Sequence, residues 1–283
     1  MTRLVVIDGV IRTPEHAVIS VYDRGFLYGD SVFETVRTYS GKLYALDQHL
    51  QRLERSAQSI GVTLPVPWEQ IGVEAKRAIV EADNDESYVR IMVTRGSGPL
   101  GLDTELATSP LRVILVEPLR SPPEAHYLEG IGAICVQTVR ASDAVHSAKL
   151  GNYLASALAL RDAKKAGAEE ALVVNRDGLV IEGTTSNVFM IKGEALVTPP
   201  LQIGILEGVT RGVVMDLAGR EGLRLVEEAH SVADLKGCAE VFITSSIREI
   251  LPVVRVDGEA IGEGKPGPVT RRLLEAFRAH VRR

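Results

Sequence analysis

The heptapeptide AKLGNYL, residues 148–154, carries a single lysine at the start of an apolar, helix-forming segment. Lys149 has small and apolar neighbours on both sides, and Tyr153 follows it after about one helical turn. Most lysines are solvated surface residues, which is the alternative here. An apolar setting, however, lowers the pKa of a lysine and makes its neutral amine available as a nucleophile. The stretch therefore raises the possibility of a reactive lysine, whose partners must be sought elsewhere in the chain.

The composition of the chain excludes several classes of protein. Its 283 residues are 45% hydrophobic and 24% charged, as in an ordinary globular protein with room for two domains. A net charge of −5 without a basic stripe argues against a nucleic-acid partner. The first residues lack an apolar leader, and no segment approaches the roughly 20 apolar residues that span a bilayer. We therefore expect a cytoplasmic protein without a membrane partner. Cys135 and Cys238 are far apart and are expected to be buried thiols, with no metal site.

Strand-like and helix-like segments are mixed in both halves of the chain. Residues 31–46 read as two strands joined at Ser40-Gly41, and a helix with Asp47 as its N-cap is expected to end at Gly61. The pattern breaks at residues 119–130, where two adjacent prolines stand among residues of mixed polarity. The sequence therefore predicts a two-domain α/β (α+β) fold. We expect a small N-terminal domain over 1–119, a linker over 120–130 and a larger C-terminal domain over 131–283.

Polar residues that could serve Lys149 lie at the ends of predicted elements. Glu182 ends an apolar strand, where it either faces water or pairs with a buried cation. The helix that begins with GVTRGVV, residues 208–214, offers free N–H groups to a phosphate, although a plain N-cap is an equal alternative. Ser245 and Ser246 form either a turn or a second phosphate contact. Arg52 is either a surface residue or a clamp for the same phosphate.

A single ligand could contact all of these residues. Such a ligand would carry an aldehyde that reacts with the lysine, a basic ring nitrogen that pairs with the glutamate and a phosphate that binds the helix N-terminus. Pyridoxal 5′-phosphate has all three, and a lysine with a carboxylate on the ring nitrogen is its general mode of binding. The residues alone therefore point to this cofactor.

The order of the motifs resembles that of the class IV (fold-type IV) aminotransferases, a family of pyridoxal-phosphate enzymes. This family holds branched-chain aminotransferases, D-amino-acid aminotransferases and aminodeoxychorismate lyases. The resemblance covers almost the whole chain and rests on seven motifs in sequence order: YGDSVFETVR (28–37), HLQRL (49–53), YVRIMVTRG (88–96), AKLGNYL (148–154), EGTTSNVF (182–189), ILEGVTRGVV (205–214) and FITSSIREILPV (242–253). It implies two domains with the cofactor between them.

The resemblance also implies roles for individual residues. Lys149 would bind the cofactor covalently and later move the proton of the substrate α-carbon. Tyr153 would contact the phenolic oxygen of the cofactor, and Glu182 would keep its ring nitrogen protonated. The remaining cofactor contacts would be a phosphate-binding set and one residue near the cofactor whose role is less defined: Arg52, the Val209 amide, Thr210, Ser245 and Ser246, with Asn187 as the additional residue.

Features of the substrate pocket divide between the branches of the family. Tyr88 and Arg90 resemble the branched-chain pattern that captures the substrate carboxylate, with Phe33 and Arg37 near the same pocket. Thr35 stands where branched-chain enzymes usually have glycine, and both Thr35 and the EGTTSN motif are closer to the other branches. Because Tyr88 and Arg90 follow the branched-chain pattern, we expect transfer of an amino group from a hydrophobic amino acid to a 2-oxo acid such as 2-oxoglutarate.

Three alternatives compete with this expectation. The first is transfer from D-amino acids or (R)-amines, and the second is lyase chemistry on aminodeoxychorismate. The third, a fold without activity, is disfavoured because Lys149 and Glu182 are both present. The resemblance further implies a homodimer in which Tyr28 and the GPLGL loop, residues 98–102, would reach the partner.

Overall fold

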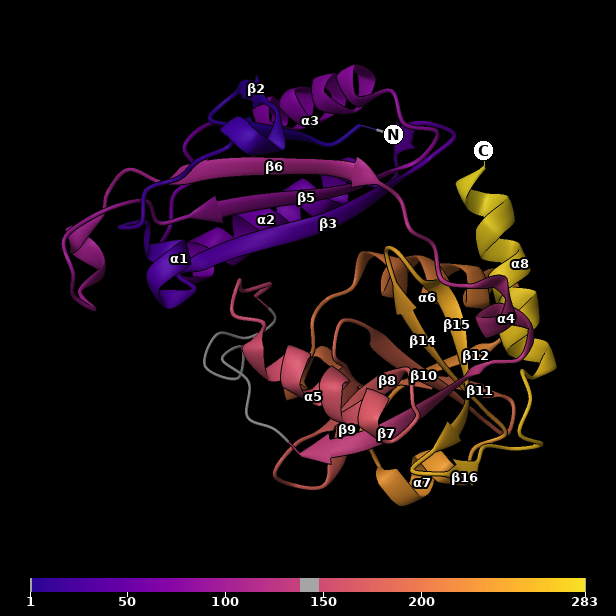
Figure 1. Ribbon diagram of the computed structural model, residues 1–283. Helices are drawn as coiled ribbons and strands as arrows, with labels where there is room; N and C mark the ends of the chain where they lie inside the picture. The colour runs from indigo at the N-terminus through magenta and orange to yellow at the C-terminus, as the bar shows by residue number, and fades with distance from the viewer. Residues whose placement is uncertain (1, 138–147, 283) are drawn as a thin grey trace. The chain divides into compact units, whose positions relative to one another are not determined.

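The computed structural model describes residues 2–137 and 148–282, and these divide into two units (Figure 1). The first unit comprises Met1–Arg120 together with Ala148–Asn152, and the second comprises Ser121–Ser147 with Tyr153–Arg283. The short segment that carries Lys149 thus has its contacts in the unit built mainly from the N-terminal part of the chain.

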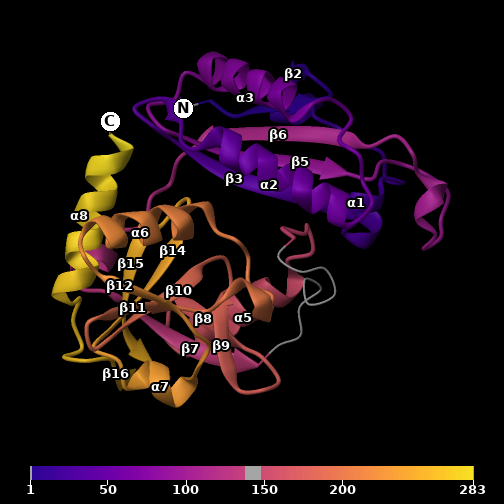
Figure 2. The same ribbon diagram turned by 180° about the vertical axis from the view of Figure 1, so that it is seen from behind.

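The first unit is built on an antiparallel sheet with the strand order β2-β1-β6-β5-β3-β4. Its strands are β1 (Leu4–Ile7), β2 (Val10–Arg12), β3 (Ser31–Tyr39), β4 (Lys42–Leu43), β5 (Ser87–Thr94) and β6 (Leu111–Pro118). The helices are α1 (Arg24–Tyr28), α2 (Leu46–Ser59) and α3 (Trp68–Ala82). Figure 2 shows α2 lying along β3 and β5, and both α2 and α3 share one apolar core with this sheet.

The two faces of β3 have different surroundings, as its period-2 pattern predicts. Val32 and Val36 are buried in the core beneath the helices, whereas Phe33, Thr35 and Arg37 alternate with them on the other face. The predicted turn at Ser40-Gly41 joins β3 to β4, and both of its residues have positive φ angles, 51° and 72°. This pair of left-handed residues is typical of the two-residue hairpin turn.

The predicted start of α2 is wrong by two residues. The helix begins at Leu46 with Ala45 in the N-cap position, so Asp47 lies inside the first turn. A carboxylate there still interacts favourably with the helix dipole, which explains why its type suited a helix start. Ile60 follows the last helical residue and Gly61 has a φ angle of 69°, as expected for a helix that stops at a glycine.

The second unit is built on a mixed sheet with the strand order β12-β11-β10-β14-β15-β7-β8-β9-β13, and β16 pairs with β15. Its strands are β7 (Ile131–Gln137), β8 (Glu170–Val174), β9 (Leu179–Gly183), β10 (Asn187–Lys192), β11 (Ala195–Thr198), β12 (Arg224–Glu227), β13 (His230–Ser231), β14 (Glu240–Ser245), β15 (Glu249–Val256) and β16 (Glu259–Ala260). The helices are α4 (Glu124–Leu128), α5 (Leu154–Lys165), α6 (Val209–Arg220), α7 (Val232–Lys236) and α8 (Pro268–Val281).

Helix α4 lies inside the segment that the sequence suggested as a linker. Its Tyr127 is buried, and the Tyr127 hydroxyl donates a hydrogen bond to the Arg248 carbonyl at 3.3 Å. Residues 121–130 are therefore an integral part of the second unit by their contacts. Both cysteines carry free thiols. Across the described ranges, every helix is too short or too polar to cross a membrane.

Candidate functional site

The segment that carries Lys149 lies against the start of β3 as a short antiparallel addition to the first unit. Leu150 forms a β-bridge with Val32, and the Phe33 N–H donates to the Lys149 carbonyl at 3.0 Å. The Gly151 N–H donates to the Ser31 carbonyl at 2.8 Å. A Cβ atom on Gly151 would lie 2.0 Å from the Ser31 hydroxyl oxygen, so a larger residue here would require the Ser31 side chain to move. Backbone pairing therefore determines where Lys149 stands.

The side chain of Lys149 lies over the ring of Phe33, a residue of β3. Its amine is 4.7 Å from the ring centroid, while the Arg90 guanidinium is 3.8 Å from the same centroid. Burial lowers the pKa of Lys149 to about 8, with the positive charges of Arg52 and Arg90 acting in the same direction and Glu34 opposing them. A substantial fraction of this amine is neutral near physiological pH.

Arg52 points into the unit and forms an ion pair that the sequence did not reveal. Its Nε and Nη2 atoms donate to the two carboxylate oxygens of Glu34, both at 2.7 Å. Burial alone would raise the pKa of Glu34, but the charge and hydrogen bonds of Arg52, aided by His49, hold it at about 2. His49 Nδ1 lies 2.7 Å from Glu34 Oε2, and burial lowers the pKa of His49. Burial thus disfavours the charged form of His49, while its Nδ1–H donates to the Glu34 carboxylate.

The expected substrate residues lie in register across β3 and β5. Thr35 is paired with Arg90, and Arg37 is paired with Tyr88, so all four project from the face that carries Phe33. Arg37 is buried, its Nε donates to the Thr38 carbonyl at 3.3 Å, and its guanidinium lies 4.1 Å from the Tyr39 ring centroid. The first unit thus brings together Lys149 and the five predicted substrate residues.

Glu182 occupies a buried position in the second unit, so the strand-end alternative that faces water is wrong. It is 6% exposed, and its Oε2 accepts the Leu206 N–H at 3.1 Å and Asn187 Nδ2 at 3.3 Å. Asn187 Nδ2 also donates to the Leu206 carbonyl at 2.9 Å. A Cβ atom on Gly208 would lie 2.0 Å from Asn187 Oδ1. The end of β9, the start of β10 and the loop before α6 are therefore fastened around this carboxylate.

The predicted phosphate-binding groups of the second unit lie at the start of α6 and the end of β14. The N-cap residue of α6 is Gly208, which has no side chain to cap the first N–H groups. Thr210 lies inside the first turn and is therefore not the N-cap. Thr210 is buried in the first turn of α6. Ser245 is the last residue of β14 and Ser246 follows it, and both serines are half-buried. Thr244, directly before them, has a buried hydroxyl without a hydrogen-bond partner among the described residues.

The structure also places Tyr153 and Tyr28, whose roles stay predictions. Tyr153 is half-buried and is the N-cap residue of α5, so by its contacts it belongs to the second unit although Lys149 belongs to the first. Tyr28 ends α1, and its hydroxyl accepts the Gly101 N–H at 3.2 Å.

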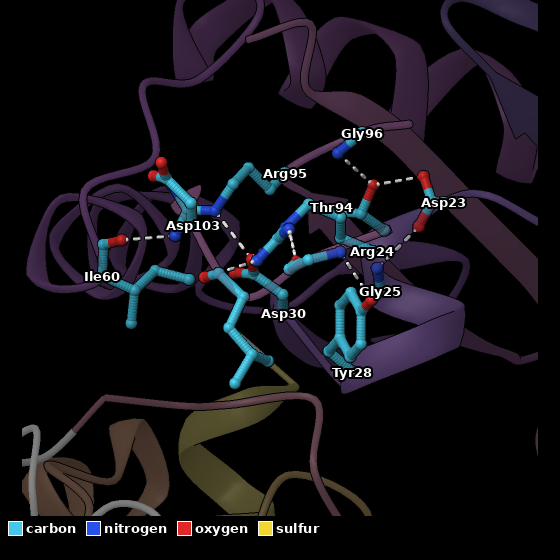
Figure 3. Close-up of polar contacts among 12 residues, drawn as sticks. Asp23, Arg24, Gly25, Tyr28, Asp30, Ile60, Thr94, Arg95, Gly96 and Asp103 are labelled. Carbon is cyan, nitrogen blue, oxygen red and sulfur yellow. Dashed lines mark hydrogen bonds and ion pairs between the residues drawn. The ribbon is translucent and has the colours of Figure 1, made fainter. Parts of the chain in front are cut away.

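Arg24 and Arg95 meet at Asp30 beside the end of β5 (Figure 3). Arg24 and Arg95 both donate to Asp30, at 2.9 and 2.7 Å. Arg24 also donates to the carbonyls of Gly101 and Leu102, and Arg95 to those of Ile60 and Gly61. Tyr28 and the loop that follows β5 are therefore held together within the first unit.

The sequence analysis did not identify four charged or titratable residues of the two units: Glu34, His49, Glu170 and Arg248. For the first two, the sequence contains a pattern that could have indicated them. Glu34 lies on the core-facing side of β3, where a carboxylate requires a partner, and His49 and Arg52 share one face of α2 by their spacing. Nothing comparable identifies Glu170 and Arg248. These two residues form a 2.7 Å ion pair in the second unit, with Glu170 fully buried.

Comparisons with known proteins assign the family. The model for class IV amino-transferases matches residues 31–256. A protein of Methanocaldococcus jannaschii, provisionally named a branched-chain-amino-acid aminotransferase, is 38% identical over 96% of this chain and 94% of its own length. The D-alanine aminotransferase of Bacillus licheniformis is 33% identical over 98% of this chain and 96% of its own.

Solved structures agree with this assignment. The branched-chain amino acid aminotransferase of Escherichia coli has a TM-score of 0.93 at 28% identity, covering 99% of this chain and 94% of that one. That of the thermophilic archaeon Thermoproteus uzoniensis, solved with norvaline, has a TM-score of 0.88 at 30% identity, covering 98% and 94%. Its motifs, its fold and its relatives thus make this chain a member of the class IV aminotransferase family, with the mixed α/β architecture of fold type IV.

Proposed function

We propose that this aminotransferase moves an amino group from a hydrophobic, branched-chain-type amino acid to a 2-oxo acid such as 2-oxoglutarate. The observation that carries the proposal is that Lys149, the proposed reactive amine, and Arg90, the proposed carboxylate-binding group, lie over the same ring of Phe33. An arginine binds a carboxylate through two parallel hydrogen bonds, which favours amino acids over amines that lack a carboxylate. The relatives named for branched-chain amino acids support the choice of side chain.

The described residues fit pyridoxal 5′-phosphate as the cofactor. A depressed lysine pKa suits an aldehyde, and a buried carboxylate at Glu182 suits a protonated ring nitrogen. The uncapped start of α6 and the hydroxyls of Thr210, Ser245 and Ser246 suit a phosphate, as does the unpartnered hydroxyl of Thr244 beside them. We propose Lys149 as the residue that binds the cofactor covalently, and Glu182, Tyr153 and Asn187 as further cofactor contacts.

When bound, the cofactor supplies a carbonyl that accepts the amino group and a ring that takes up electrons from the substrate α-carbon. The protein must then move the proton of that carbon, and Lys149 is the group suited to do so. At pH 7.5 about one such amine in four is neutral when its pKa is about 8, against about one in a thousand at the ordinary lysine value. Burial and the charge of Arg52 therefore prepare Lys149 to act as a base.

The other residues hold and orient. Glu182 would keep a proton on the ring nitrogen, and Asn187 orients the carboxylate by donating to its Oε2. The amide of Val209 and the hydroxyls of Thr210, Ser245 and Ser246 would donate to phosphate oxygens. Arg52 would add its charge, although two of its nitrogens are already engaged by Glu34, which partly offsets that charge.

Transfer from D-amino acids is the second candidate, favoured by several relatives named D-alanine aminotransferase. The test incubates the pyridoxal-phosphate-loaded protein with 2-oxoglutarate and either L-leucine or D-alanine, and scores the chirality of the glutamate formed. We expect L-leucine to be consumed and L-glutamate to form. Turnover of D-alanine with release of D-glutamate would replace the first candidate by the second, and release of pyruvate from aminodeoxychorismate would replace both by a lyase.

The protein is also proposed to act as a homodimer. Exposed apolar side chains gather on α1, on the segment before it and on the loop after β5, including Val21, Tyr22, Phe26, Leu100 and Leu102. A main-chain hydrogen bond from Gly98 to the Tyr22 carbonyl joins these segments into one surface. An apolar patch of this kind marks an interface, and a second copy of the chain would cover it.

Light scattering should give a mass of twice the 30.6 kDa chain mass, and the Leu102→Asp variant should give a lower mass. A monomeric wild-type protein would contradict this proposal.

A further inference from the structure

The second unit contains a buried ion pair that the roles assigned so far do not use. Glu170 is the first residue of β8 and is fully buried, and its carboxylate lies 2.7 Å from Arg248 Nη1. Burial by itself would raise the pKa of Glu170. The charge of Arg248 and the hydrogen bonds of Thr184 and the Ala171 N–H outweigh that effect and hold the pKa below its usual range. Glu170 is therefore a charged anchor at neutral pH.

The carboxylate of Glu170 holds the turn between β9 and β10. It accepts the Thr184 N–H at 3.2 Å, the Thr184 hydroxyl at 2.6 Å and the Ser186 hydroxyl at 3.0 Å. The turn is tight, because the Gly183 N–H donates to the Ser186 carbonyl at 2.7 Å. A Cβ atom on Gly183 would lie 2.1 Å from the Ser186 hydroxyl. This turn separates Glu182, the proposed partner of the ring nitrogen, from Asn187, which donates a hydrogen bond to the Glu182 carboxylate.

The guanidinium and backbone of Arg248 hold the turn that follows β14. Nη2 of Arg248 donates to the Thr185 hydroxyl at 2.7 Å, and the Arg248 N–H donates to the Ser245 hydroxyl at 3.2 Å. On the opposite side, the Arg248 carbonyl accepts the Tyr127 hydroxyl of α4. Arg248 thus connects the turn before β10 with the Ser245 hydroxyl at the end of β14.

Sheet register explains why one ion pair reaches both turns. Strands β10 and β14 are antiparallel neighbours, and Asn187 at the start of β10 is paired with Thr244 at the end of β14. The two turns therefore lie at the same end of these neighbouring strands, where a single arginine can contact both. A fork of guanidinium nitrogens suits this task, because each nitrogen binds a different acceptor in a fixed geometry.

From this geometry we infer that Glu170 and Arg248 are positioning residues that hold the two turns together and so set the phosphate-binding hydroxyls of Ser245 and Ser246. The inference rests on the proposed cofactor, since the phosphate is the group those hydroxyls would bind. Neither residue needs to touch the phosphate. Their effect is to keep the donor hydroxyls and the Glu182–Asn187 pair in one arrangement, so that binding does not have to order them.

The test measures phosphate binding separately from turnover. Full-length protein is stripped of cofactor, and dissociation constants for pyridoxal 5′-phosphate and for competing inorganic phosphate are measured for wild type, Glu170→Gln and Arg248→Met. A hydrogen bond to a charged group is worth about a factor of 10 or more, so misplacing one serine hydroxyl should raise both constants about 10-fold. Thr185→Val removes only the contact of an exposed residue and should fold normally, with a rise of about 3-fold.

Glu240→Gln is the matched control. Glu240 is a buried carboxylate of the same sheet, and it accepts the Thr270 N–H and hydroxyl at the start of α8, away from both turns. It should lose thermal stability without a change in phosphate affinity. Equal changes in all variants, or unchanged phosphate affinity in Glu170→Gln and Thr185→Val, would overturn the positioning role. A wild-type protein that binds neither probe would instead refute the proposed cofactor, and the inference with it.

Discussion

Replacing Glu34 by glutamine should destabilise the first unit by an amount that the structure allows us to work out. The carboxylate is fully buried and its two oxygens accept Arg52 at 2.7 Å, which holds its pKa at about 2 against a reference value of 4.5. Each pKa unit corresponds to about 1.4 kcal/mol, so the pairing contributes about 3 kcal/mol at pH 7. Breaking one side of a buried ion pair typically costs about 3–5 kcal/mol, which agrees.

The pH dependence of this loss identifies the carboxylate. The folded-state pKa lies below the unfolded-state value, so the stabilisation is fully present above pH 4.5 and is lost as pH falls through about 2. The free-energy difference between wild type and Glu34→Gln should thus be constant from about pH 7 to 5 and fall to about half by pH 3. Trp68, the only tryptophan of the chain, packs against the core of this unit, and its fluorescence during urea unfolding reports the stability.

A control separates this effect from a general loss of buried charge. Glu74 is a buried carboxylate of α3 that pairs with Arg112 at 2.9 Å. Glu74→Gln should also destabilise the unit but should leave the reactivity of Lys149 unchanged, whereas Glu34→Gln should lower the pKa of Lys149, because Glu34 raises it. A cost below about 1 kcal/mol for Glu34→Gln, or a difference that persists unchanged at pH 3, would refute the reasoning.

Four further predictions concern the proposed chemistry. Lys149→Ala should abolish both the visible absorbance of bound cofactor and turnover; a remaining borohydride-reducible link would identify another lysine. Acylation of Lys149 in the cofactor-free protein should rise with pH around a midpoint near 8, and a midpoint above about 10 would contradict its desolvation. Glu182→Gln should lower turnover on the order of 10²-fold or more, and normal turnover would leave Glu182 a structural residue. Arg90→Ala should lower the kcat/KM ratio of L-leucine to an (R)-arylalkylamine by roughly 10- to 150-fold, and an unchanged ratio would remove its carboxylate role.

Local patterns in the sequence predicted many of the elements and the desolvated setting of Lys149. Alternation places Phe33, Thr35 and Arg37 on one face of β3, and the predicted Ser40-Gly41 turn is found in the structure. These features depend on neighbours a few residues apart, whose geometry is set by the period of the element. The order of the motifs was sufficient to identify the family.

Contacts between distant segments could be read only from the tertiary structure. Leu150 pairs with Val32, Glu34 binds Arg52 from an adjacent helix, and Glu170 meets Arg248 although they are far apart in the chain. A periodic pattern states which face of an element is buried, but it does not state which charge on another element will be buried against it. That choice depends on strand register and on the packing of helices over the sheet, where a buried carboxylate is tolerated only if a cation reaches it.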